Sequence, residues 1–199
     1  VEIIDQRSEI ALVSVINHPD LGALKRSIET NQQRKVSILK PEEVKSLQNY
    51  NILILYQPTT SFKAIFEQNK VAQINTFIIT GTATDFNFLN QVQNDLLFKM
   101  SAQKEDYLAT FDSNFNLFSQ ANIGFENFPP LEHKFGTIAA KSNVNTLLSA
   151  RIRNVQLQNP LLTFTENGSK RNAYLLGENI WKWRLENNLN KKSFEDFDL

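Results

Sequence analysis

Four short apolar runs dominate the first half of the chain, and each is followed by a polar turn and a helical pattern. The runs are continuous rather than alternating, which is typical of strands buried on both faces of a sheet. Repeated strand–helix units with short connections predict an α/β fold with a mostly parallel sheet and helices on both faces. The predicted strands are residues 10–16, 35–39, 52–56 and 77–80.

The pattern changes in the second half. Residues 96–130 carry repeated phenylalanines among Asn, Ser and Asp, and we expect an irregular but ordered excursion, because a solvated linker would not hold so many rings. Strand signals return at 135–140, 147–148 and 161–165, and Asn167-Gly168 predicts a hairpin turn into 172–177. We therefore expect C-terminal antiparallel strands and a terminal helix. One domain would span 1–190, followed by a tail or linker at 191–199.

Composition narrows the classes of function. The 199 residues include 21 basic and 21 acidic side chains, so the excess positive charge that drives binding to nucleic acids is missing. The sequence has no cysteine, which excludes thiolate metal sites and cysteine nucleophiles. No apolar run approaches the length of a membrane span, and no cofactor motif is present. Because no signal peptide opens the sequence at Val1, we expect a piece of a longer protein.

The connection after the fourth predicted strand has the layout of a nucleophile elbow. Gly81 would allow the sharp turn, Ala83 falls in the position of the nucleophile, and Asp85 stands where a second glycine is usual. A slip of one residue offers Thr82 or Thr84, whose hydroxyls would need an adjacent base. We favour an ordinary strand-to-helix connection with Asp85 as the helix N-cap, over a binding turn or a catalytic threonine.

The ends of the other strands carry further polar residues. Because ligands of parallel sheets usually bind at the carboxyl ends of the strands, His18, Asp20 and Gln57 are candidate cleft residues. His18 and Asp20 would serve as a general base or as half of a metal site, but two ligands are too few for a metal. We favour a turn in which Asp20 caps the following helix. His133 has no acid two residues beyond it and is interpreted as a surface residue.

The last helix opens with two further candidates. Glu178 follows the last predicted strand and is the more plausible polar cleft residue. Trp181 and Trp183 would form a ligand platform if exposed, since indole rings stack on sugars or partner side chains. We favour core packing for the two indoles.

With these residues in place, the chain resembles the class I glutamine amidotransferase-like domains of large bacterial membrane proteins with von Willebrand A-type segments, as found in Bacteroidetes. The resemblance covers residues 8–190. It is carried by four stretches: His18-Pro-Asp, Tyr56-Gln-Pro-Thr-Thr-Ser-Phe, Thr80-Gly-Thr-Ala-Thr-Asp and Gly177-Glu-Asn-Ile-Trp-Lys-Trp-Arg184.

The resemblance implies a flavodoxin-like sheet and, in the parent protein, an extracytoplasmic position behind membrane helices, with the other parent domains as partners. The enzymes of that superfamily use a cysteine on the elbow with a histidine and a glutamate. This sequence has no cysteine, so amidotransferase chemistry is excluded.

Three hypotheses follow. The first is a non-catalytic scaffold or binding module of a larger envelope protein. The second is a hydrolase that uses His18, Asp20 and a hydroxyl of Thr82 or Thr84. The third is a protein-docking module that uses the aromatic excursion at 96–130, which requires several of its rings to lie in one solvent-facing patch.

Overall fold

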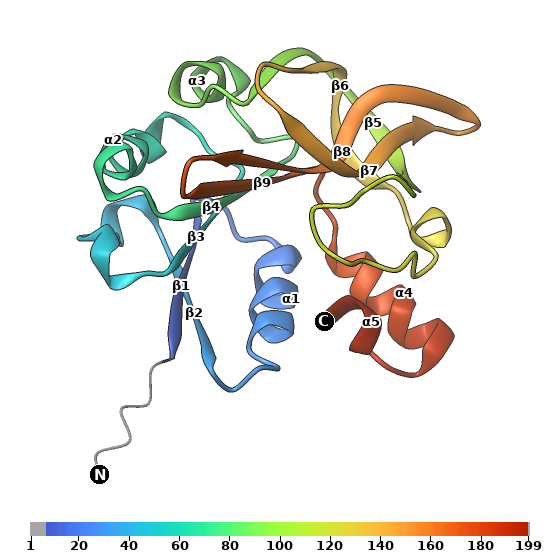
Figure 1. Cartoon of the computed structure of the whole chain (residues 1–199), viewed down its shortest axis with the longest axis horizontal. Coiled ribbons are helices and arrows are strands. Elements are labelled where there is room, and N and C mark those ends of the chain that lie inside the picture. Colours follow the sequence, from blue (N-terminus) through green and yellow to red (C-terminus); the bar gives the residue numbers. More distant parts are fainter. Residues whose placement is uncertain (1–6, 199) are drawn as a thin grey trace.

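The computed structural model describes residues 7–198, and these form an α/β fold around a nine-stranded mixed sheet (Figure 1). Residues 1–6 and 199, at the ends of the predicted domain and tail, lie outside the described part. The strand order is β2-β1-β3-β4-β9-β8-β7-β5-β6. The strands are β1 (Ser8–Ser14), β2 (Arg34–Leu39), β3 (Ile52–Tyr56), β4 (Asn75–Thr80), β5 (Leu96–Phe111), β6 (Leu131–Ala140), β7 (Val144–Ile152), β8 (Val155–Asn167) and β9 (Lys170–Leu176).

The first half of the sheet is parallel, as the sequence predicts. Strand β1 lies between β2 and β3, and β4 continues the parallel order on the far side of β3. Strand β9 returns from the end of the chain to pair with β4 in parallel and with β8 in antiparallel register. The predicted hairpin is confirmed, with Gly168 at φ +61° in the turn between β8 and β9.

The described residues also form five helices: α1 (Pro19–Ile28), α2 (Lys63–Ala72), α3 (Phe86–Val92), α4 (Trp181–Lys191) and α5 (Glu195–Asp198). Short 3₁₀ turns lie at Pro41–Glu43, Leu47–Asn49, Thr60–Phe62 and Phe125–Asn127. Within residues 7–198, none of these helices has the length and the apolar character that crossing a membrane would take.

Alternate residues of the central strands pack in two separate clusters, as expected when successive side chains of a strand point in opposite directions. Leu12 of β1 packs in one cluster, which also includes Leu24 of α1. Its neighbour Val13 packs in the other cluster, with Phe66 of α2 and Leu89 of α3.

The expectation of an irregular excursion at 96–130 is wrong for its first half, because residues 96–111 form the long strand β5. Residues 96–107 of β5 pair with β6, with a register shift between Met100 and Lys104, and residues 108–111 pair with β7. The polar stretch of β5, residues 101–104, is exposed, so the strand has no buried face there that would give an apolar pattern.

The remainder of the excursion, residues 112–130, is a loop with one 3₁₀ turn. Phe125 and Phe128 are buried, as is Phe98 in β5, whereas Phe115 is partly buried and Phe118 is 44% exposed. This distribution does not match the solvent-facing patch that a docking module requires.

The predicted tail is folded where the structure describes it. The guanidinium of Arg184 in α4 forms two hydrogen bonds of 2.9 Å with the carboxylate of Asp198 in α5, and it lies 3.9 Å from the ring centre of Phe194. These contacts hold α5 against α4.

The paired strands β5 and β6 form a ribbon, which we call the β5–β6 ribbon. Gly136 lies at its register shift, and replacing this residue tests the packing there. A Cβ on Gly136 would lie 2.2 Å from the Lys99 carbonyl oxygen, which is backbone and moves only with the strand. We expect Gly136→Ala to lower the free energy of unfolding by roughly 2 kcal/mol. Gly22→Ala in α1 is the control, because its Cβ would meet only the flexible end of Arg26, and we expect a gain of about 0.5–1 kcal/mol. Urea unfolding of both variants checks this, and equal effects would contradict it.

Candidate functional site

The carboxyl ends of four parallel strands bring most of the predicted site residues to one edge of the sheet. His18 follows β1, Gln57 follows β3, Gly81 follows β4 and Glu178 follows β9. These strands are adjacent in the order β1-β3-β4-β9, so residues far apart in sequence meet.

A hydrogen-bonded network joins the last three of these strand ends. The Gln57 amide nitrogen donates to one carboxylate oxygen of Glu178, and the Thr82 hydroxyl donates to the other at 2.8 Å. The Gln57 amide oxygen accepts the backbone N–H of Ala83 at 2.7 Å. Gln57 and Glu178 are both buried. The polar groups of the two side chains are therefore paired by hydrogen bonds, and these bonds fix the turn after β4.

Gly81 is needed here for space. A Cβ at this position would lie 2.6 Å from the Gln57 amide nitrogen and 2.6 Å from a Glu178 carboxylate oxygen. Any larger residue would push these two side chains apart.

The turn itself is an ordinary connection in its geometry. The Thr84 hydroxyl accepts the Gly81 N–H at 2.9 Å, and Asp85 accepts the Phe88 N–H at 2.9 Å, which confirms the predicted N-cap of α3. Ala83, in the position of the nucleophile, is exposed. Residues 82–84 are not among the described residues with positive φ, so the backbone strain of a nucleophile elbow is missing here.

Backbone strain occurs instead at the neighbouring strand ends. Gln57 has φ +49° and Asn179 has φ +79°, values that non-glycine residues adopt at a cost. Gln57 is itself part of the network, and Asn179 directly follows Glu178 and donates its backbone N–H to Asp20.

Asp20 does not cap α1, which corrects the sequence-based interpretation. The N-cap is His18, whose Nδ1 accepts the Asp20 N–H at 3.1 Å. The Asp20 carboxylate is fully buried and accepts three hydrogen bonds, from the Tyr56 hydroxyl at 2.8 Å and from the N–H groups of Asn179 and Trp181 at 2.8 and 2.9 Å. A buried carboxylate needs such donors, and here they come from β3 and from the start of α4.

Asp20 also raises the pKa values of its neighbours. Partial burial by itself lowers the pKa of His18, but the hydrogen bond and the charge of Asp20 outweigh it, so the pKa lies above its ordinary value. His18 Nδ1 lies 3.3 Å from Asp20 Oδ2. Burial, aided by the same charge, raises the pKa of the Tyr56 hydroxyl, which therefore stays protonated and donates.

His133 is buried, which contradicts its interpretation as a surface residue. It is 1% exposed, and its Nε2 lies 2.8 Å from the hydroxyl of Thr80, the last residue of β4. Its Nδ1 lies 3.0 Å from the Lys134 carbonyl oxygen. A carbonyl can only accept, so Nδ1 carries the hydrogen and Nε2 accepts from Thr80. Burial lowers the pKa of His133 to about 4, so the imidazole is neutral at pH 7.

The Thr80–His133 pair has the hydrogen-bond arrangement of a nucleophile and its base, but Thr80 is also fully buried. The ring of Phe86 packs edge-on to His133 with centroids 5.1 Å apart, and Tyr107 packs on it at 6.2 Å. These contacts come from α3 and β5 and shield the pair from solvent.

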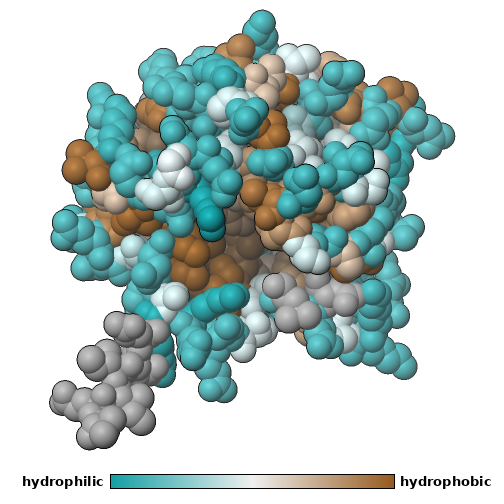
Figure 2. Space-filling view, in the orientation of Figure 1, coloured by the Kyte–Doolittle hydropathy of each residue, from teal (hydrophilic) through white to brown (hydrophobic). Residues whose placement is uncertain are grey.

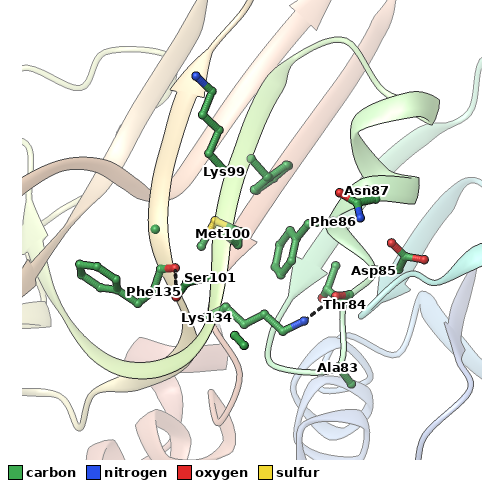
Figure 3. Close-up of a pocket in the computed structure, with 13 residues that line it drawn as sticks. Ala83, Thr84, Asp85, Phe86, Asn87, Lys99, Met100, Ser101, Lys134 and Phe135 are labelled. Carbon is green, nitrogen blue, oxygen red and sulfur yellow. Dashed lines mark hydrogen bonds between the residues drawn. The ribbon is translucent and has the colours of Figure 1, made fainter.

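A cavity of about 990 Å³ opens beside the turn, between it and the β5–β6 ribbon (Figure 3). Figure 3 shows Lys134 extended from β6 toward Thr84, whose carbonyl oxygen accepts from its ammonium group at 3.4 Å. The same ammonium group lies 5.4 Å from the ring centre of Phe86. The lining consists of Ala83, Thr84, Asp85, Phe86, Asn87, Phe98, Lys99, Met100, Ser101, Ala102, Lys134, Phe135 and Gly136.

The predicted site residues thus fall into three groups. Ala83, Thr84 and Asp85 line the cavity. Gln57, Gly81, Thr82 and Glu178 form the network behind it, and His18 with Asp20 forms a second network at the start of α1. In the part of the chain that the structure describes, no three His, Asp or Glu side chains are placed to hold a metal ion.

The two indoles of α4 differ in their surroundings. Trp183 is buried, stacks on Phe128 with centroids 5.3 Å apart, and donates from its ring nitrogen to the Pro129 carbonyl at 2.6 Å. Trp181 is half-buried, and its backbone N–H donates to the Asp20 carboxylate. The arrangement favours core packing for Trp183.

Sequence reasoning missed Tyr56, Thr80 and His133 as members of the site. Tyr56 and Thr80 are the last residues of their strands, which is a usable signal, but their partners lie on segments that only the folded sheet brings near. Comparison with protein-family models found no match, and comparison with curated proteins found no similar sequence.

Removing the charge of Asp20 tests its structural role. In Asp20→Asn one oxygen becomes an NH₂ group that faces existing donors, so we expect a loss of about 3 kcal/mol in the free energy of unfolding. Asp85→Asn is the matched control, because Asn caps helices as well as Asp does, and we expect a change below about 0.5 kcal/mol. Denaturant unfolding measures both, and similar losses would argue against this role.

The depressed pKa of His133 predicts a pH dependence of stability. The unfolded chain binds a proton at His133 near its ordinary pKa of 6.5, whereas the folded protein does so near about 4. Stability is therefore lost as the pH falls from 6.5 to 4, by roughly 3 kcal/mol. We expect His133→Gln to flatten this part of the curve, while His18 contributes equally to both proteins. Identical pH profiles of unfolding between pH 4 and 7 would refute the assignment.

Proposed function

We propose that the chain is a non-catalytic binding module with a flavodoxin-like arrangement, related to class I glutamine amidotransferase-like domains. The order β2-β1-β3-β4-β9 supports the arrangement, since it matches the 2-1-3-4-5 order of flavodoxin-like sheets. The two clusters along β1, one with α1 and the other with α2 and α3, support helices on both faces.

One observation carries the proposal of a non-catalytic role. The position of the nucleophile holds the methyl group of Ala83, and the backbone N–H of Ala83 is already bonded to Gln57. Both carboxylate oxygens of Glu178 also accept hydrogen bonds from within the site. The polar groups behind the turn are thus used for structure, and the turn offers a ligand only its outer surface and the cavity beside it.

The cavity supports the binding part of the proposal. Its volume of about 990 Å³ is at the upper end for small-molecule sites, and it combines the aromatic ring of Phe86 with the ammonium group of Lys134. The hydroxyl of Ser101 and the carboxylate of Asp85 are further polar groups in the lining. We infer that a small polar ligand binds here.

A hydrolase remains the second candidate, and the Thr80–His133 pair is the observation that favours it. The version that uses His18 with Thr82 or Thr84 has less support, because Thr82 donates to Glu178 and the Thr84 hydroxyl accepts within the turn. For the pair at Thr80 to act, its hydroxyl would have to become accessible to a substrate.

The resemblance alone motivates the remaining part of the proposal. It places the domain in a larger, extracytoplasmic envelope protein, whose other domains would be its partners. A docking role for residues 96–130 receives less support, because Phe98, Phe125 and Phe128 are core residues.

An assay of hydrolysis together with ligand binding separates the two candidates. We expect no turnover of ester, amide or glycoside substrates above the level of a heat-denatured control. We also expect thermal-shift hits from a library of polar metabolites, which Lys134→Met weakens and Lys141→Met, on the exposed turn after β6, does not. Turnover that Thr80→Val abolishes while the fold persists would establish the hydrolase instead. A library without hits would remove the ligand-binding part of the proposal.

A further inference from the structure

A second cavity lies at the opposite ends of the parallel strands, away from the candidate site. Its floor is formed by the amino-terminal parts of the strands, including Ile10, Ile54 and Phe77. Leu24 and Ile28 of α1 form one wall. We name it the amino-end groove, and its volume is about 750 Å³. Figure 2 shows a hollow with hydrophobic residues around it on the face viewed.

The opposite wall of the groove is a cluster of three packed phenylalanine rings. Phe118, from the loop after β5, packs edge-on to Phe164 of β8 with ring centres 5.2 Å apart, and Phe115 contacts both rings at 4.8 and 5.8 Å. Phe118 nevertheless remains 44% exposed, and Ile52 on the floor is 37% exposed. The loop thus turns an apolar sheet surface into a concave site while leaving apolar side chains open to solvent.

The polar groups of the groove are mostly paired with one another. The Arg171 guanidinium lies 3.0 Å from the Glu166 carboxylate, and Asn172 and Thr165 both donate to Asp95, at 2.9 and 3.0 Å. The guanidinium of Arg34 is different: within residues 7–198 it has no hydrogen bond or ion pair, and the residue is exposed at the mouth of the groove. The groove therefore combines an apolar interior with one uncompensated positive charge at its edge.

We propose that the amino-end groove binds a single-chain amphiphile with a carboxylate head, such as a medium- or long-chain fatty acid. The alkyl chain lies along the strand floor between α1 and Phe118, and the carboxylate pairs with Arg34. The volume lies within the range of small-molecule sites, which are largely apolar with few polar groups. An anionic head complements Arg34, and a guanidinium binds carboxylates in a bidentate manner.

Calorimetric titration of the full chain with dodecanoate and with neutral 1-dodecanol tests the proposal. We expect saturable one-to-one binding of both. Phe118→Ala should weaken both ligands about ten-fold through the loss of apolar contact. Arg34→Gln should weaken dodecanoate about five-fold and leave dodecanol unchanged.

The matched control is Lys35→Gln, which removes one positive charge from the next residue, outside the groove lining. It should leave both affinities unchanged. An equal effect of Lys35→Gln and Arg34→Gln would show non-specific attraction and overturn the site, as would an undiminished affinity in Phe118→Ala. Chemical-shift changes on addition of dodecanoate to the unmodified protein must map to the groove, whatever the folding of the variants.

Absence of saturable dodecanoate binding by the unmodified protein would also overturn the proposal. If sedimentation then showed a dimer that Phe118→Ala dissociates, the groove would be a surface for a second copy of the chain instead. The groove and the cavity beside Ala83 lie at opposite strand ends. Neither result therefore decides whether a ligand binds in the cavity, which the experiment on the proposed function tests separately.

Discussion

The buried carboxylate of Asp20 is the interaction on which the arrangement of this sheet depends most directly. A charge with no exposure is stable inside a protein only when donors surround it. Its donors lie 36, 159 and 161 residues away in sequence, on Tyr56, Asn179 and Trp181. They assemble only when β1, β3 and β9 lie in the correct order, so the cost of burying Asp20 is offset only in the complete fold.

The network of Gln57, Thr82 and Glu178 extends the same constraint across the edge of the sheet. Glu178 precedes Asn179, so the turn from β9 into α4 takes part in both networks at once. Asn179, in this turn, and Gln57, after β3, both have positive φ values, and their hydrogen bonds hold them in place. At this edge the polar side chains are therefore hydrogen-bonded to one another. Shape and the surrounding cavities are then what remain available for recognition.

Local patterns predicted the parts of this structure that local physics determines. The parallel strands, the hairpin at Gly168 and the cap at Asp85 each follow from residues close in sequence. The role of Asp20 did not, because a carboxylate at a helix start is typical of a cap and its true donors are distant. His133 and β5 were hidden for a related reason: the former is buried by segments far along the chain, and the latter carries exposed polar residues along its outer part.

The β5–β6 ribbon is the reason why we propose binding rather than catalysis at this edge. A neutral imidazole that accepts a hydroxyl hydrogen is the correct state for a general base, and the pKa of His133 near 4 ensures that state at neutral pH. A base must also reach its substrate, yet Tyr107 of β5 and Phe86 of α3 cover the imidazole. The ribbon that brings His133 to Thr80 therefore also covers the pair, together with α3. Their outer surface, with Lys99 and Lys134, forms the wall of a cavity instead.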